Sequence, residues 1–229
     1  NLFQNSLYQD GGGCAMFIAN AKLSQFESTY KLSFEDCTWS KNSASFGGAF
    51  SYGNNALVRD IELVFERGTF SDNIASGQRG GALYLSTTQQ IILDECTFTN
   101  NRCHNSETQA AKQGGAIFIA SCSSISITGS TFAGTYATNG HAIFVDDIPS
   151  ANVFGCTFDS NNANREGSQI ATNCAEFTLY DCTIKFNEKK VQARGIEIMK
   201  RCSSSFVNCN FLNCNISDYG GGIHIVEDT

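Results

Sequence analysis

The sequence predicts an all-β protein that folds as a right-handed parallel β-helix, a single-stranded solenoid of about eight rungs. The first observation behind this prediction is a pair of small residues, most often Gly-Gly, that precedes a short apolar segment and recurs every 26 to 34 residues. That period matches one turn of a solenoid and is too short for an independent domain. The pairs begin at Gly13, Gly47, Gly80, Gly114, Gly140, Gly167, Ala193 and Gly220.

The second observation is a motif of the form acidic/Gly-Cys-Thr-Phe-x-x-Asn that follows the openings, as in Glu95 to Asn101 and Gly155 to Asn161. Equivalent residues of successive rungs lie above one another, about 4.8 Å apart. We therefore expect interior columns of identical side chains. One column contains Phe70, Phe98, Phe132 and Phe158, and another contains Ile117, Ile143, Ile170 and Ile196.

The third observation is alternation. Between each opening and its motif, apolar residues occupy every second position, which is typical of a strand with one buried face. One inward column comprises Phe34, Phe65, Leu93, Ile127, Val153, Leu179 and Phe206, and its neighbour comprises Leu32, Leu63, Ile91, Ile125, Ala151, Phe177 and Ser204. The alternation breaks before the Cys position, so we expect a tight corner there, at residues that tolerate a left-handed backbone or suit turns. These residues are Asp36, Arg67, Glu95, Gly129, Gly155, Asp181 and Asn208.

We expect residues 1–229 to form one β-helix domain that is open at both ends. Insertions lengthen the early repeats near 19–31, 54–60 and 103–113, and loops on a rigid scaffold are common binding sites. A doubly wound α/β fold would need amphipathic helices between the strands, but Ser, Asn, Thr and Gly fill these gaps. The chain also has no heptads and no apolar run of about 18 residues, which argues against a coiled coil and against a membrane span in this segment.

The composition limits the classes of partner. The chain is 41% hydrophobic and carries a formal net charge of −7, which suits a soluble protein with a sizeable core. Its acidic charge and scattered basic residues disfavour nucleic acid as a partner. Because the cysteines and histidines show no zinc-type spacing, we expect neither a metal nor any other cofactor.

Eleven cysteines are many for a cytosolic protein, although six of them occupy repeat columns that suit a small buried residue. Cys174 and Cys202 occupy the same corner of neighbouring rungs and are the disulfide candidate. Cys156 and Cys182 are expected to stay reduced. In-register residues have Cβ atoms about 4.8 Å apart, beyond the roughly 3.8 Å that a disulfide prefers.

Three surface features are candidates for function. Outward positions form an aromatic stripe that could pack against a partner or bind sugar; its members are Phe17, Tyr84, Phe118 and Phe144. An acidic row on one outward corner is the alternative site, for calcium binding or acid/base chemistry; it consists of Glu35, Glu66 and Asp94. Asn215 begins an Asn-Ile-Ser sequence, an N-glycosylation acceptor.

The two repeated motifs resemble those of the chlamydial-type polymorphic outer-membrane protein family, over nearly the whole chain. The matching segments are Gly47 to Phe50, Gly80 to Leu83 and Gly114 to Ile117 for the openings, and Phe70 to Asn73, Phe98 to Asn101 and Phe158 to Asn161 for the second motif. The resemblance implies an extracellular β-helical stalk or adhesin, often carried on a much longer chain.

Together these features predict a non-enzymatic structural protein that is extracellular or on the cell surface. It would be a rigid rod that acts as a stalk, an adhesin segment or a filament subunit. The expected partners are further copies stacked end to end, or further rungs of a longer chain, with glycans as an additional candidate. The alternatives are a polysaccharide-processing enzyme similar to pectate lyases or polygalacturonases, which is disfavoured because the acidic row has no His or Lys beside it, and a carbohydrate-binding module.

Overall fold

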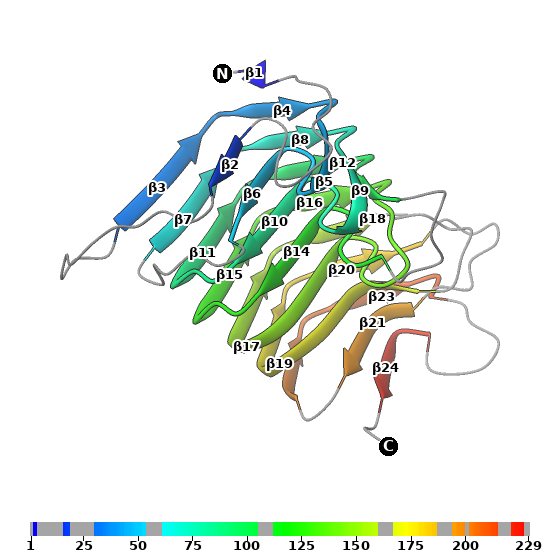
Figure 1. The fold of residues 1–229 in the computed structure, drawn as a ribbon. Helices are drawn as coiled ribbons and strands as arrows, with labels where there is room; N and C mark the ends of the chain where they lie inside the picture. The colour runs from blue at the N-terminus through cyan, green and yellow to red at the C-terminus, as the bar shows by residue number, and fades with distance from the viewer. Residues whose placement is uncertain are drawn as a thin grey trace.

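The computed structural model describes residues 2–3, 16–18, 30–53, 61–104, 112–159, 167–186, 194–199, 202–214 and 221–226. These residues form an all-β parallel solenoid of about six turns, fewer than the eight rungs that the openings predict. Figure 1 shows the rungs stacked in sequence order, from the blue N-terminal end to the red C-terminal end. The predicted fold class, a parallel β-helix, is confirmed.

The first sheet is built from the Thr-Phe motif, with one short strand from each rung. Each strand pairs in parallel with the equivalent strand of the next rung, for example Phe98 with Phe132. In spatial order the strands are β1 (Leu2–Phe3), β4 (Thr38–Ser40), β8 (Thr69–Ser71), β12 (Thr97–Thr99), β16 (Thr131–Ala133), β18 (Thr157–Asp159), β20 (Thr183–Lys185) and β23 (Asn210–Leu212).

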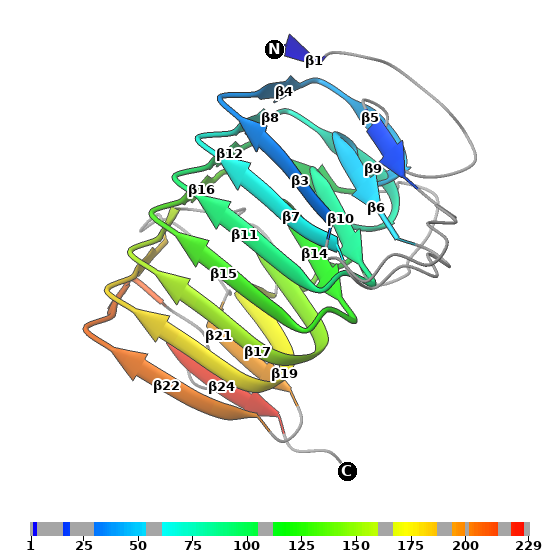
Figure 2. The same ribbon diagram turned by 90° about the vertical axis from the view of Figure 1, so that its left-hand side faces the viewer.

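The second sheet combines the opening strands with the strands that precede the motif. The opening strands are β2 (Met16–Ile18), β6 (Phe50–Tyr52), β10 (Leu83–Ser86), β14 (Ile117–Ala120), β21 (Arg194–Met199) and β24 (Ile223–Val226). The others are β3 (Tyr30–Glu35), β7 (Ile61–Glu66), β11 (Gln90–Asp94), β15 (Ser124–Thr128) and β22 (Ser203–Val207), which lie side by side in Figure 2. Two long strands belong to both groups, namely β17 (Ile143–Phe154) and β19 (Ser168–Tyr180).

A small third sheet follows the Thr-Phe strands of the early rungs. It contains β5 (Ser43–Phe46), β9 (Ile74–Arg79) and β13 (Arg102–Cys103). Its inward side is a small cluster formed by Ala75, Cys103 and Ala137. Isolated bridges continue the same ladder to the next rung, where Arg102 pairs with Tyr136.

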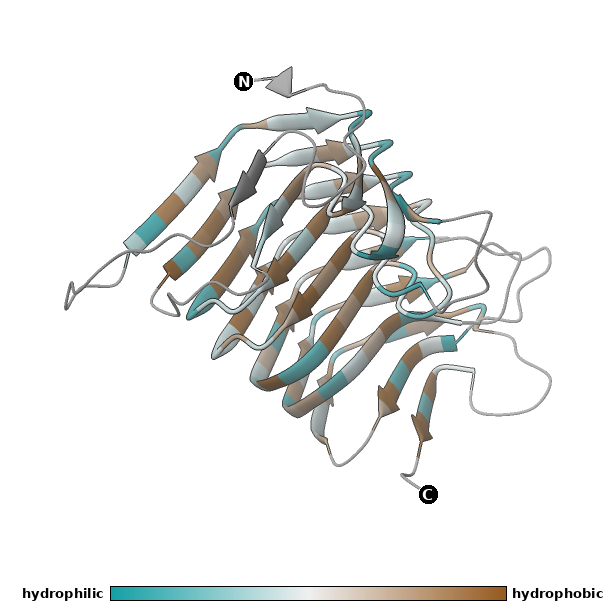
Figure 3. Cartoon of the chain, in the orientation of Figure 1, coloured by the Kyte–Doolittle hydropathy of each residue, from teal (hydrophilic) through white to brown (hydrophobic). Residues whose placement is uncertain are grey.

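The predicted interior columns are present. Phe98 is fully buried and stacks on Phe70 and Phe132, with ring centroids 4.6 Å and 4.8 Å apart and interplanar angles of 4° and 2°. The column runs on to Phe158 at one end and to Trp39 at the other. The isoleucine column is confirmed as well, because Ile117, Ile143, Ile170 and Ile196 pair in succession and are buried. Figure 3 shows the corresponding alternation of apolar and polar colour along the strands.

The corner before the Cys position is also confirmed. All seven predicted residues have a left-handed backbone, with φ between 50° and 59°. Arg67 and Glu95 adopt it although they lack the freedom of glycine or asparagine. A second left-handed corner, which the sequence analysis missed, follows the Thr-Phe strands at Lys41, Asp72, Asn100, Gly134 and Asn213.

The Gly-Gly openings are needed for close approach of neighbouring rungs. Gly80 has φ of 65°, in the left-handed region. A Cβ atom on Gly81 would overlap the backbone carbonyl oxygen of Gly115 in the next rung. Only residues without a bulky side chain therefore allow the backbones of neighbouring rungs to approach this closely at the openings.

The Asn at the end of the motif forms a buried ladder. Oδ1 of Asn73 accepts hydrogen bonds from the backbone N–H of Asn42 (3.1 Å) and from its Nδ2 (3.0 Å). Asn73 in turn donates from Nδ2 to Oδ1 of Asn101 (2.9 Å) and to the carbonyl of Trp39 (2.9 Å). The three asparagines are fully buried. Water does not reach the polar groups there, so the asparagine amides satisfy one another and the neighbouring backbone groups.

The Cys column has a polar role that the sequence analysis did not predict. The thiols of Cys156 and Cys182 donate to the carbonyl two residues earlier, each at 3.2 Å. In the same column the hydroxyl of Ser130 donates to the carbonyl of Thr128 at 3.0 Å. Ser130 Oγ also accepts from the N–H of Cys96 (3.0 Å), as Cys182 Sγ does from Cys156 (3.3 Å). Where the column holds Cys or Ser, the small side chain also satisfies backbone groups at the corner, whereas Gly68 occupies the same position without a side chain.

Two of the predicted insertions are shorter than expected. The first was expected near 19–31, but Tyr30 and Lys31 are the first residues of β3. The third was expected near 103–113, but Cys103 lies in β13 with its side chain fully buried, and Gln113 pairs with Arg79 and Asn139. Burial and backbone pairing hold these ends in the solenoid. Residues 19–29, 54–60 and 105–111 lie outside the described residues.

Candidate functional site

The last described rung exposes the edges of the core columns. Its strands β22, β23 and β24 each pair on one side only within the described part of the chain. Ile225 is 65% exposed, whereas its partner one rung earlier, Ile198, is 2% exposed. Phe206 is likewise only partly buried, although Leu179 in the same column is fully buried. This surface is an apolar cross-section edged by backbone groups, which is a template for strand pairing.

The opposite edge of the same sheet is formed by β3, which pairs with β7 alone among the described strands. Its inward residues Leu32 and Phe34 belong to the columns that end at Ser204 and Phe206, and both are partly buried. The two ends of the described solenoid therefore present the same columns in the same spacing.

The acidic row is present, but a cation lies within it. Glu35, Glu66 and Asp94 pair in register on the outward corner. Arg67 forms salt bridges with Glu35 and with Asp36 (2.8 Å), and its guanidinium lies 3.9 Å from Glu66. The hydrogen bond from Arg67 lowers the pKa of Asp36. Arg67 thus pairs with Glu35, Asp36 and Glu66 at this corner. This geometry differs from that of two carboxyl groups that share a proton.

No group of three or more His, Cys, Asp or Glu residues suited to hold a metal ion occurs among the residues with a described placement. Beyond Asp94 the corner row continues through Thr128, Phe154, Tyr180 and Val207. The last three are exposed apolar residues, so the chemical character of the corner changes from acidic to apolar along the rod.

The aromatic stripe is stacked but is not an exposed surface. The ring of Phe118 stacks on Tyr84 (5.5 Å, 6°) and on Phe144 (5.6 Å, 9°). Phe118 is fully buried and Phe144 is 3% exposed, because the stripe is covered from outside; the guanidinium of Arg79, for instance, lies 4.7 Å from the centre of the Phe118 ring. These rings form a second small core with Ala120 and Ala171. The expectation that they bind a partner or a sugar directly is wrong at Phe118 and Phe144; the side chain of Phe17 lies outside the described residues.

Cys174 and Cys202 are brought together as the sequence analysis expected. Their sulfur atoms are 3.8 Å apart, and both are free thiols in this structure. Burial raises the pKa of the Cys174 thiol to about 12, and the hydroxyl of Thr172 lies 2.9 Å from its sulfur. The disulfide stays a prediction, and so does the glycosylation of Asn215, which lies outside the described residues.

One surface hollow was missed by the sequence analysis. It has a volume of about 340 Å³ and is lined by Asn100, Arg102, His104, Gly134 and Tyr136. The information was present in the sequence, because the alternation that buries Asn101 and Cys103 must turn residues 100, 102 and 104 outward.

The part of the chain with a described structure contains no helix that is long and apolar enough to cross a membrane.

Comparison with known proteins agrees with the architecture. The model of one protein family, described as the right-handed β-helix region, matches residues 1–211. No curated protein and no solved structure matches the chain. Because the family model spans most of the sequence, and the stacked parallel rungs are those of a β-solenoid, the chain belongs to the right-handed β-helix region family.

Proposed function

We propose that this chain is a non-enzymatic structural segment of an extracellular or cell-surface protein: a rigid β-helical rod that extends by stacking rung on rung. It would serve as a stalk, an adhesin segment or a filament subunit. The observation that carries the proposal is the set of ladders that join neighbouring described rungs: stacked rings such as Phe70 and Phe98, buried asparagines such as Asn73 and Asn101, and parallel backbone pairing.

Rigidity follows from the ladders. Stacked aromatic rings, buried asparagines and the Cys-Ser corner residues each connect neighbouring rungs, in addition to the parallel backbone pairing. In a solenoid each rung contacts only its neighbours, so such repeated contacts determine the stiffness of the whole rod. Stiffness is the property that a stalk or a filament needs.

The partner of the exposed edge is a further copy of the chain, or a further rung of the same protein. The columns that include Phe34 and Leu32 at one end run through the rod to Phe206 and Ser204 at the other, so a further rung with the same repeat would continue both columns. A contact between two unlike ends does not close on itself and therefore propagates along the axis.

An extracellular or surface location is supported by sequence features. The repeats resemble those of chlamydial-type polymorphic outer-membrane proteins, the Asn-Ile-Ser sequence at Asn215 fits a secreted protein, and eleven cysteines suit an oxidising compartment. These features support a surface-exposed stalk or adhesin more than a cytosolic scaffold.

The experiment measures the size of the purified 229-residue chain by sedimentation velocity and electron microscopy over a range of concentrations. We expect rods that lengthen with concentration. Ile225→Lys places a charge on the edge and should prevent growth, whereas Val207→Lys is the control, because Val207 is in the same rung but on the outward corner. Particles of constant size at every concentration, or an Ile225→Lys variant that grows like the wild type, would contradict the proposal.

A further inference from the structure

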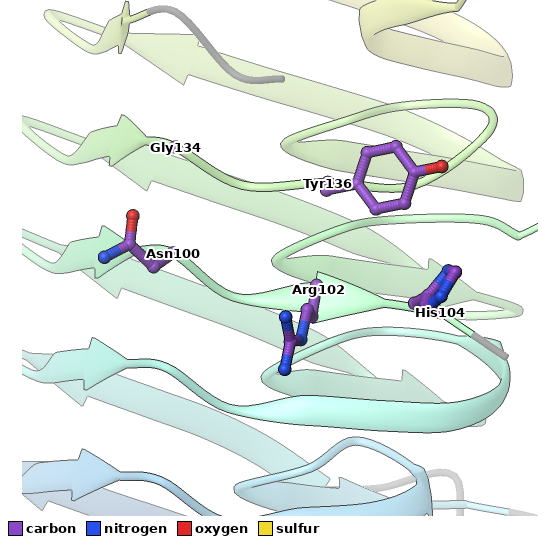
Figure 4. Close-up of a pocket in the computed structure, with 5 residues that line it drawn as sticks. All are labelled: Asn100, Arg102, His104, Gly134 and Tyr136. Carbon is purple, nitrogen blue, oxygen red and sulfur yellow. The ribbon is translucent and has the colours of Figure 1, made fainter. Parts of the chain in front are cut away.

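The hollow beside β13 is built by two neighbouring rungs. Asn100, Arg102 and His104 project from one rung because Asn101 and Cys103 between them are buried. Tyr136 stands beside Arg102 on the next rung, as the backbone bridge between them shows. Figure 4 shows the three residues following one another along one rung, with Gly134 and Tyr136 on the adjacent rung.

Gly134 provides the space for the hollow. Its φ is 62°, and a Cβ atom at this position would overlap Oδ1 of Asn100. A side chain here would therefore displace the Asn100 amide and fill the gap between Asn100 and Tyr136. Because Gly134 has no side chain, the Asn100 side chain lies against its backbone at one end of the hollow.

Tyr136 is held in place by two histidines. Its ring stacks on the fully buried ring of His141, with centroids 6.1 Å apart and an interplanar angle of 14°. On the other side His104 lies at 6.0 Å with a tilt of 56°. Burial lowers the pKa of His141 to about 4, so the imidazole behind Tyr136 is neutral at physiological pH. Half-buried Tyr136 is therefore a fixed ring at the side of the hollow.

Arg102 brings a cation to this surface. No salt bridge to Arg102 is formed by any residue that the structure describes, and its cross-strand neighbours are Ile74 and Tyr136, which carry no charge. Arg67, by contrast, forms ion pairs with the acidic corner. In a chain with a net charge of −7, an exposed guanidinium without a carboxylate partner in the described surface is suited to an anionic ligand.

We propose that this hollow binds a carboxylated sugar residue of a glycan. The planar guanidinium of Arg102 matches a carboxylate through two parallel hydrogen bonds. The ring of Tyr136 offers an apolar face to the sugar ring, while the Asn100 amide and the His104 imidazole bond its hydroxyls. A volume of about 340 Å³ lies in the range of roughly 300–1,000 Å³ typical of small-molecule sites, at its lower end, so the hollow has room for a sugar unit.

The carboxylate distinguishes this ligand from a neutral sugar and from a sulfate or phosphate ester. A neutral sugar would leave the guanidinium without an anion. Because the planar fork also binds tetrahedral ester anions through two hydrogen bonds, the test includes a sulfated sugar that separates the two kinds of anion. The site is independent of the end-to-end association proposed above, since its residues lie on the side of the rod and none belongs to the exposed edge.

The test is calorimetric titration of the full chain with four trisaccharides: tri-galacturonate, 3′-sialyllactose, neutral galactotriose and a sulfated galactotriose. Binding of either acidic glycan, with no heat from the neutral one, supports the proposal, and the tighter of the two identifies the source of the carboxylate. Equal binding of the neutral sugar, equal binding of a sulfated trisaccharide, or no binding of any acidic glycan would overturn it.

The residue assignment is tested by variants. We expect Arg102→Gln and Tyr136→Ala to weaken binding of the acidic glycan at least tenfold, and Arg102→Lys to weaken it because the fork is lost although the charge stays. Lys41→Gln removes one positive charge from an exposed corner outside the hollow and is the control, with unchanged affinity. Because the Arg102 side chain is exposed, its variants should keep the wild-type circular dichroism and melting temperature. An Arg102→Gln variant that binds like the wild type would contradict the assignment.

Discussion

Replacing Phe98 by alanine removes the middle ring of the five-ring aromatic column. Phe98 is fully buried and stacks on both neighbours, at 4.6 Å and 4.8 Å between centroids. Truncation of a buried phenylalanine costs about 3–5 kcal/mol. The two stacked contacts, each worth about 0.5–1.5 kcal/mol beyond burial, place this site at the upper end of that range. We therefore expect a loss of about 5 kcal/mol in the free energy of unfolding.

Urea unfolding followed by tryptophan fluorescence measures this loss. Trp39 is the single tryptophan, is fully buried, and stacks on Phe70 in the same column, so its emission reports on the column itself. With a urea m-value of about 2 kcal/mol/M, a 5 kcal/mol loss lowers the midpoint by about 2.5 M. Phe154→Ala is the matched control: Phe154 is 37% exposed on the outer corner, and its truncation should cost about 1 kcal/mol. A Phe98→Ala variant no less stable than Phe154→Ala would refute the interior column.

Three further predictions concern buried polar groups. Asn73→Ala should cost about 3 kcal/mol by thermal or urea unfolding, because it deletes four buried hydrogen bonds of the asparagine ladder, with Asn210→Ala, at an exposed position of β23, as the near-neutral control. Cys174 and Cys202 should resist alkylation in the native, unreduced protein and appear as a linked pair by mass spectrometry; a labelled Cys174 would rule out the disulfide. His141 has a pKa of about 4 in the folded protein, below its ordinary 6.5, so the unfolded chain takes up a proton first as pH falls. About 3 kcal/mol of stability should therefore be lost between pH 6.5 and 4, and His141→Ser should lose less over this window; the same pH slope in both proteins would disprove it.

The repeat made most of the fold predictable from the sequence. The phenylalanine and isoleucine columns follow from a fixed period, since equivalent residues of successive rungs must stack. The first corner was predictable even at Arg67, because the break in alternation locates it whichever residue occupies it. The second corner, at residues such as Lys41 and Asp72, is located in the same way, by a break in the alternation after the Thr-Phe strand.

The surface was less predictable, because alternation tells which side of a strand a residue faces but not what lies outside that strand. Phe118 faces away from the main core, yet Arg79 from another rung lies over its ring. The acidic row was found, but Arg67 was counted as part of a corner and not as the cation that pairs with Glu35 and Asp36. In the Cys column, Ser130 indicates that a small side chain at this position can also act as a hydrogen-bond donor.

The direction of the hydrogen bonds has a mechanical consequence. The backbone ladders, the bonds between Asn73 and Asn101, and the bond from Cys156 to Cys182 all connect one rung to the next, so they run along the axis of the rod. A pull along that axis loads all the bonds of an interface at once, and the rod resists until the whole interface separates. A pull that peels the chain from one end loads the bonds one after another and needs far less force. Such a rod is strong in tension along its length and is unravelled most readily by a protease or a force that takes hold of a terminal strand.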